Sequence, residues 1–250
     1  MTNLGHTNRS ARRTIAGRRF AAIVFDDGFQ RAAEIAAPIL KLYGFYASFY
    51  VVTSWVGSTW ALIRDPYNLG RVHGTWEFWR RVAALGHEVG SHTFSHINVQ
   101  GLQAKLCPWV GPLDMWLALR QLKREIPANS YTISMPWNAS TRISKYFAKK
   151  YYSACVLGDS DARYVDFSHS DLHALASWAP EPRHSWNDYV KAVQQIPDGS
   201  ALIFQFHSFG DEGWYPITKQ LLDSLCGLLA EQEVEVRSVQ KLVEMHKCEG

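Results

Sequence analysis

Short apolar runs alternate with amphipathic stretches along most of this chain. From residue 20 onward, runs rich in β-branched and aromatic residues, typical of strands, are separated by longer stretches with the apolar spacing of helices. The expected strands are Phe20–Phe25, Phe45–Val52, His87–His92, Tyr131–Met135, Tyr152–Leu157, Ala201–Phe206 and Val234–Val239. The expected helices are Arg31–Tyr43, Thr75–Leu85, Pro112–Glu125, Thr141–Lys150, Ser185–Gln195, Ile217–Glu231 and a last short helix.

About seven β/α units follow from this order, and they predict an α/β fold in which helices cover a parallel sheet. Such a sheet is either closed into a barrel or open and doubly wound. Polar residues stand where strands end, after residues 25, 91 and 206, and this favours a barrel, whose active sites gather at the carboxyl ends of the strands. Two irregular segments, 54–71 and 158–183, are long enough to be functional loops over that face.

Composition indicates an ordinary globular protein. The chain has 250 residues, of which 47% are hydrophobic and 20% charged, so we expect one domain with a sizeable core over residues 20–250. Five arginines precede the first strand, and residues 1–19 are expected to be a basic, flexible segment. The net charge of +3 indicates no nucleic-acid partner. No cleavable signal or spanning stretch is visible, which predicts a protein that is cytoplasmic or already processed and has no membrane partner.

Two adjacent carboxylates, Asp26 and Asp27, end the first apolar run. They repel each other, and burying both is costly unless a cation or a proton lies between them. His92 and His96 have the i, i+4 spacing that places two imidazoles on one face of a helical turn. Together with one carboxylate they form a set suited to a divalent metal, most simply zinc, with open positions for water and substrate. The pattern indicates a metal-dependent hydrolase.

The residues around both motifs resemble those of the polysaccharide deacetylases that share the NodB homology domain, carbohydrate esterase family 4. Residues 25–28 (FDDG) are similar to the first motif of that family, written TFDDG, and residues 91–96 (SHTFSH) are similar to its HxxxH motif. The resemblance extends over residues 20–239, nearly the whole chain. It implies a distorted parallel (β/α) barrel, in agreement with the alternation of elements.

The resemblance also implies a role for each candidate residue. Asp27 would bind the metal together with His92 and His96. Asp26 would be the general base for the attacking water, while the metal lowers the pKa of that water and polarises the amide carbonyl. His207 matches the histidine of the last family motif and would protonate the leaving amine, since imidazole exchanges protons near neutral pH. The implied cofactor is one divalent metal ion, zinc or another transition metal.

The third motif of the family departs from its usual form in this chain. Pro136 and Trp137 are retained and would line the substrate site, with the Trp137 backbone N–H in an oxyanion hole. Ser134, however, stands where the family has an arginine that pairs with the base. A serine supplies no charge, so the base is expected to have another partner, such as Arg142, Arg163 or water.

Two later motifs also differ. The fourth motif, an Asp and a Trp, has only loose candidates in Asp159, Asp161, Asp166 and Trp178. In the last motif, Gln205 replaces a leucine that belongs to the pocket for the acetyl methyl group.

The predicted function is hydrolysis of a carbon–nitrogen bond that is not a peptide bond, namely removal of an N-acetyl group from an amino sugar or an N-acetylated glycan. One alternative is an amidohydrolase that acts on a small intracellular non-sugar amide of the ureide kind. The other is a carbohydrate-binding relative without activity. The partner is therefore a carbohydrate or a small N-acylated molecule. The sequence does not name the sugar, the metal or the oligomeric state.

Overall fold

The structure, a computed structural model, describes residues 17–58, 71–159, 161, 163–167 and 169–249. Most of the predicted basic segment 1–19 and most of the irregular segment 54–71 lie outside these residues, so both stay predictions. Across the described residues, no helix is both long enough and apolar enough to cross a membrane.

The predicted elements are present, with ends that shift by a few residues at most. The strands are β1 (Phe20–Phe25), β2 (Ser48–Val51), β3 (Glu88–Ser91), β4 (Thr132–Ser134), β5 (Ala154–Asp159), β6 (Tyr164–Asp166), β7 (Leu175–Trp178), β8 (Ser200–Phe206) and β9 (Glu235–Val236). The helices are α1 (Gln30–Leu42), α2 (Trp76–Ala84), α3 (Leu102–Leu106), α4 (Val110–Glu125), α5 (Arg142–Tyr151), α6 (Trp186–Gln194), α7 (Lys219–Glu231) and α8 (Val239–Glu249), with the 3-10 turn η3 (Pro136–Asn138). Residues 158–183 are mostly irregular, as predicted, but they include two short strands, β6 and β7, that the sequence did not indicate.

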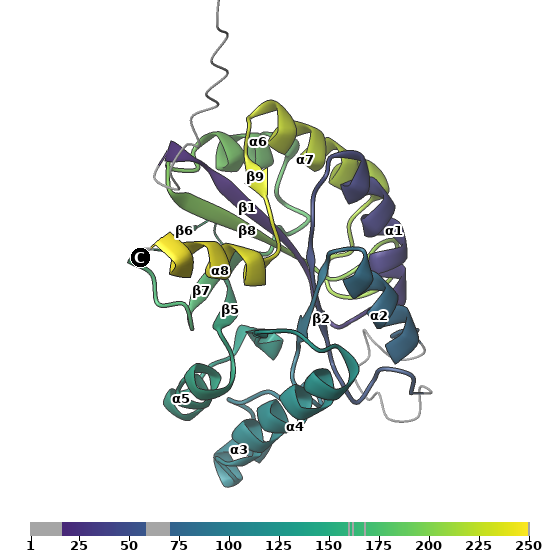
Figure 1. Ribbon diagram of the computed structural model, residues 1–250, viewed down its shortest axis with the longest axis vertical. Coiled ribbons are helices and arrows are strands. Elements are labelled where there is room, and N and C mark those ends of the chain that lie inside the picture. Colours follow the sequence, from purple (N-terminus) through teal and green to yellow (C-terminus); the bar gives the residue numbers. More distant parts are fainter. Residues whose placement is uncertain (1–16, 59–70, 160, 162, 168, 250) are drawn as a thin grey trace, which may run out of the picture.

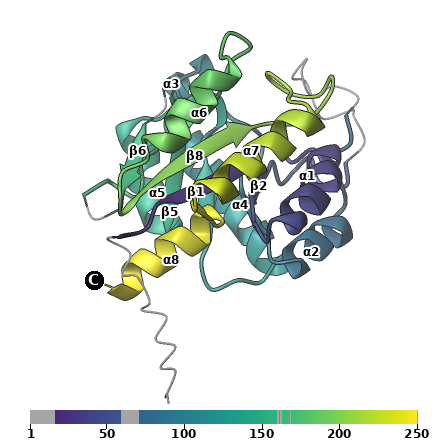
Figure 2. The same ribbon diagram turned by 90° about the horizontal axis from the view of Figure 1, so that it is seen from above.

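The strands close into a parallel barrel, with the helices around its outside (Figures 1 and 2). The ring runs β1-β2-β3-β4-β5-β7-β8 and returns to β1, which confirms the predicted barrel of about seven strands and excludes an open sheet. It is distorted, since β3–β4 and β7–β8 meet through one residue pair each, whereas β1–β8 meet through six. β6 pairs antiparallel with β8, and β9 pairs with the start of β1.

The apolar run of β1 has no polar alternation because both of its faces are buried. All six residues are buried. Phe20, Ala22 and Val24 belong to a cluster that includes Tyr50 and Ile203 of neighbouring strands. The intervening residues 21, 23 and 25 belong to the larger cluster that packs under the helices.

Helix α8 closes the end of the barrel where the strands begin. Its Val239 N–H donates to Ser48 Oγ and its Gln240 N–H donates to Glu88 Oε2, each over 2.9 Å. Ser48 and Glu88 are the first residues of β2 and β3. The candidate site therefore lies at the opposite end, where the strands terminate.

Candidate active site

The strand ends bring the predicted catalytic and metal-binding side chains to one cavity of about 250 Å³. Its lining includes Asp26, Asp27, His92, His96, Trp137 and His207. Pro136 is buried beside it in η3 and is not part of the lining. Gln205 also lines the cavity, together with Met135, Asn138, Ala179 and Trp214, to which the sequence motifs assigned no role.

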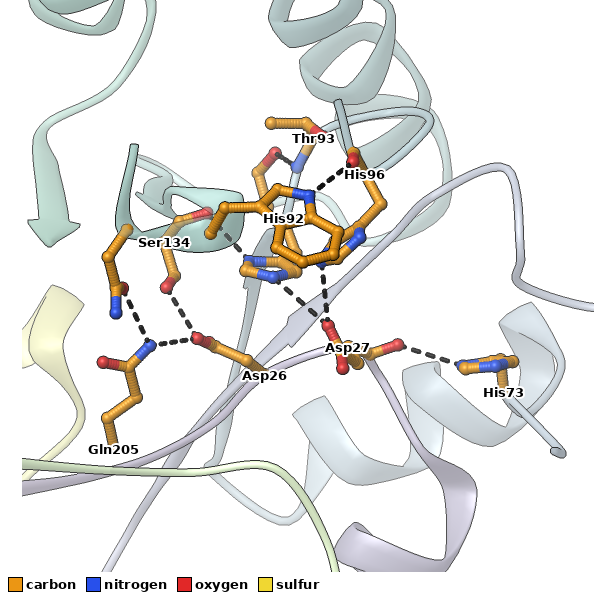
Figure 3. Close-up of polar contacts among 11 residues, drawn as sticks. Asp26, Asp27, His73, His92, Thr93, His96, Ser134 and Gln205 are labelled. Atoms are coloured by element: carbon orange, nitrogen blue, oxygen red, sulfur yellow. Dashed lines mark hydrogen bonds and ion pairs between the residues drawn. The ribbon is translucent and has the colours of Figure 1, made fainter. Parts of the chain in front are cut away.

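A sharp turn after β1 separates the two carboxylates. Asp27 and Gly28 have φ values of 67° and 69°, in the left-handed region that favours glycine. A Cβ on Gly28 would lie 3.0 Å from Val51, so a larger residue at this position would be both strained and crowded. Asp26 and Asp27 consequently meet different partners, as Figure 3 shows.

Asp27, His92 and His96 form a candidate metal site (Figure 3). Asp27 Oδ1 lies 3.3 Å from His92 Nε2 and 3.2 Å from His96 Nε2, and the potential ligand atoms are all within 4.8 Å of one another. His92 Nδ1 lies 2.9 Å from the carbonyl oxygen of Ser134, which can only accept, so Nδ1 carries the hydrogen. That tautomer leaves the Nε2 lone pair for a metal, the arrangement usual for ligating histidines.

The charges in this cluster stabilise one another. Burial alone would raise the pKa of Asp27, but the charge of His96 and hydrogen bonds from His92 and His96 hold it well below its usual value. Burial alone would lower the pKa of His92, but the nearby carboxylates of Asp26 and Asp27 raise it instead. The pocket therefore favours an ionised Asp27 beside positive charge, which a divalent ion would supply in place of protons.

The two histidines do not lie on a helical turn, so that prediction is wrong. β3 ends at residue 91, and the following loop has Thr93 and His96 in the left-handed region, with φ of 65° and 58°. Asp114 of α4 fixes the loop by accepting two backbone N–H groups and the Ser95 hydroxyl, the last over 2.6 Å. The loop still brings the imidazoles of His92 and His96 together, with ring centroids 5.0 Å apart.

Asp26 is held by neutral side chains. Its Oδ2 accepts the Ser134 hydroxyl over 2.9 Å and the Gln205 Nε2–H over 2.5 Å, and the residue is 1% exposed. Arg142 and Arg163, the predicted alternatives, are exposed at the surface instead. Asp26 Oδ1 is buried and accepts no hydrogen bond from the described residues.

His207 follows β8 directly, and the β1–β8 register places it near the carboxylates. Phe25 pairs with Phe206, so the residues after the two strands, Asp26 and His207, are neighbours at the cavity. Trp137 is 57% exposed, and its ring centroid lies 5.4 Å from that of His96. An oxyanion role for Trp137 stays a prediction.

Two of the loose candidates for the fourth motif lie away from the cavity, while the side chain of Asp159 lies outside the described part of the chain. Trp178 is 2% exposed and packs against Tyr189 and Phe204 in the core. Asp166 contacts His169 over 2.8 Å at the surface. Neither lines the cavity.

Comparison with known proteins gives a family match over residues 14–109, to the model described as polysaccharide deacetylase. The matched region contains both the Asp-Asp doublet and the histidine pair. Among curated proteins, a gellan lyase from a Bacillus species is 35% identical over 75 residues. These cover 30% of this chain but only 2% of that much longer protein.

Several solved structures share the fold over most of the chain. The Xyl-CE4 domain of a multidomain xylanase, from the hindgut metagenome of Trinervitermes trinervoides, is 16% identical with a TM-score of 0.59, and 92% of each chain is covered. Peptidoglycan deacetylase PdaC from Bacillus subtilis is 18% identical with a TM-score of 0.57, and 95% of each chain is covered. A CE4 family pseudoenzyme from Bacillus anthracis is 13% identical with a TM-score of 0.57, covering 91% of this chain and 66% of that one.

Proposed function

We propose that this chain, whose residues 14–109 match the polysaccharide deacetylase family, is a metal-dependent hydrolase that removes an acetyl group from the nitrogen of an amino sugar or an N-acetylated glycan. The observation that carries this proposal is that two sets of residues with different chemical roles line one cavity. Asp27 with the histidine pair forms a potential metal site, while Asp26 and His207 remain beside it as a potential base and acid. Binding alone would require neither a base nor an acid.

One divalent ion, with zinc the first candidate, would be held by Asp27, His92 and His96. The set fits, because two imidazole nitrogens and one carboxylate oxygen are the ligands of many catalytic zinc sites. The ion would polarise the substrate carbonyl and lower the pKa of the attacking water. Ser134 supports this site through its carbonyl, which fixes the tautomer of His92.

The chain's own residues account for the protons. Asp26 would take a proton on Oδ1 from the water as the oxygen of that water attacks the carbonyl carbon. His207 would give a proton to the nitrogen as the carbon–nitrogen bond breaks, so that the products are acetate and a free amine. Trp137, beside His96 and largely exposed, would offer an apolar face for a sugar ring.

The first experiment is a measurement of acetate release from N-acetylglucosamine oligomers, with bound metal determined in the same preparation. Metal and acetate together support the proposal. Metal with no acetate would favour the amidohydrolase that acts on a small amide, and the absence of both would favour a binding module without activity.

Substitutions then assign the roles. Asp26→Asn should abolish turnover while the metal content stays near one ion per chain, because the ligands are intact. His92→Ala or His96→Ala should lower the metal content itself. Full activity of Asp26→Asn would show that another group is the base, and unchanged metal in both histidine variants would remove them from the metal site.

A further inference from the structure

Gln205 lies between the candidate base and a residue that no sequence motif indicated. Its Nε2 lies 2.5 Å from Asp26 Oδ2, and its Oε1 lies 2.7 Å from the hydroxyl of Ser177 on β7. All three residues are buried, with exposed fractions of 4% for Gln205, 1% for Asp26 and 0% for Ser177. Water is therefore largely excluded from these two hydrogen bonds, which strengthens both.

The chemistry of the groups fixes the direction of each hydrogen bond. An ionised carboxylate only accepts, so the NH₂ end of Gln205 must face Asp26. The carbonyl end must then face Ser177, whose hydroxyl is the donor. The second N–H of Gln205 is directed toward Asn138 Oδ1 at 3.4 Å. Both polar atoms of Gln205 are thus engaged with other side chains, although the residue also lines the cavity.

The position of Gln205 is also set by the most extensive strand pairing in the barrel. β1 and β8 pair through six residues, with Val24 opposite Gln205 and Phe25 opposite Phe206. The end of β1 therefore cannot shift relative to Gln205 without breaking this register. With the backbone fixed, the Gln205 side chain can still rotate its amide, and the hydrogen bond from Ser177 restricts that rotation.

We propose that Ser177 and Gln205 are positioning residues that orient Asp26. Ser177 orients the amide of Gln205, and Gln205 together with Ser134 holds Oδ2 of Asp26. Oδ1, which accepts no hydrogen bond from the described residues, is left for the attacking water. These neutral donors occupy the role for which the family motif uses an arginine. The inference rests on the proposed function, since it assigns the base a reaction to perform.

The test is a double-mutant cycle on acetate release with Ser177→Ala, Gln205→Leu and the double variant. Gln205→Leu should lower kcat about ten- to hundredfold, because it removes a hydrogen bond to a buried charge. Ser177→Ala should lower kcat about two- to tenfold in the wild-type background, through the loss of a neutral hydrogen bond, and should have no further effect beside Gln205→Leu. Metal content should stay unchanged in all variants, because neither residue contacts the metal ligands. The KM of Ser177→Ala should also stay unchanged, because Ser177 does not line the cavity.

Ser200→Ala, at the other end of β8, is the matched control and should keep the wild-type kcat. The inference would be overturned if Ser177→Ala lowered kcat by the same factor in the wild type and in Gln205→Leu. A wild-type kcat for Gln205→Leu would also overturn it. A wild-type protein that releases no acetate would instead defeat the proposed function. In that case urea unfolding of the wild type, the two single variants and the double variant still tests the Ser177–Gln205 contact on which the inference depends. Non-additive free energies of unfolding support this contact, and additive ones overturn it together with the inference.

Discussion

Mild acid should destabilise this fold through His87, a histidine that lies outside the candidate active site. Its side chain is buried just before β3, and its Nδ1 accepts the backbone N–H of Ala47 over 3.1 Å. The rings of Tyr46 and Phe49 pack edge-on around it, at 6.0 and 5.5 Å. Burial lowers the pKa of His87 from 6.5 to about 4, because the charged imidazolium would lose its hydration there.

The direction of the effect follows from proton binding in the two states. Between pH 6.5 and about 4, the unfolded chain binds a proton at His87 and the folded chain does not. Stability is therefore complete above pH 6.5 and is lost as the pH falls toward about 4. At about 1.4 kcal/mol for each pH unit, the loss is about 2 kcal/mol at pH 5 and about 3 kcal/mol once His87 is protonated in both states. That is a large fraction of the stability of an ordinary domain.

The assay is urea unfolding at pH 7.5 and pH 5.0, in the presence of a chelator so that metal loss at acid pH does not contribute. His87→Asn keeps an acceptor for the Ala47 N–H but does not titrate, so its free energy of unfolding should fall about 2 kcal/mol less than that of the wild type. His169→Asn is the control, because the side chain of His169 is 84% exposed, and it should behave as the wild type does. Equal pH dependence in the wild type and His87→Asn would refute the reasoning.

Three further outcomes are expected. Gly213→Ala would place a Cβ 2.6 Å from the Cβ of His207, at a backbone φ of +77°. Displacement of His207 should lower kcat about a hundredfold while the metal content stays unchanged, and an unaltered kcat would contradict this. Gly90→Ala would place a Cβ 2.4 Å from the ring of fully buried Tyr50, which should cost about 1–3 kcal/mol in a denaturation measurement. Chelation should abolish activity, added zinc should restore it, and zinc should raise the melting temperature of the wild type but not of His96→Ala. An equal rise in both proteins would place the ion elsewhere.

Periodicity was sufficient to predict most of the fold, because strands buried on both faces and amphipathic helices leave strong patterns. β6 and β7 were missed for a physical reason. They have only three and four residues, and they lie in a stretch rich in Asp, His, Ser and Pro. Their strand conformation depends on pairing with β5 and β8, which are remote in sequence.

Part of the candidate site consists of short sequence motifs, and part depends on contacts between residues that are distant in sequence. The Asp26-Asp27 doublet and the histidine pair are each contained in a short segment, so the sequence indicated them directly. The hydrogen-bond partners of Asp26 were not found, since Ser134 is 108 positions away and Gln205 is 179 positions away. Ser177, which bonds to Gln205, is a further 28 positions from it. Such contacts depend on strand register, which one sequence does not reveal.

Ser134 and Gln205 are separate departures when the sequence is compared with the family motifs, but in the structure they meet at one oxygen of Asp26. Compared with the family motif, this pair keeps hydrogen-bond donors on Asp26, the proposed base, and lacks the positive charge of an arginine beside it. No Arg or Lys is among the described residues that line the cavity. The charge that balances two buried carboxylates must then come from the histidines and from the ion they would bind. Activity in this chain should therefore depend on the metal both for chemistry and for keeping the two carboxylates side by side.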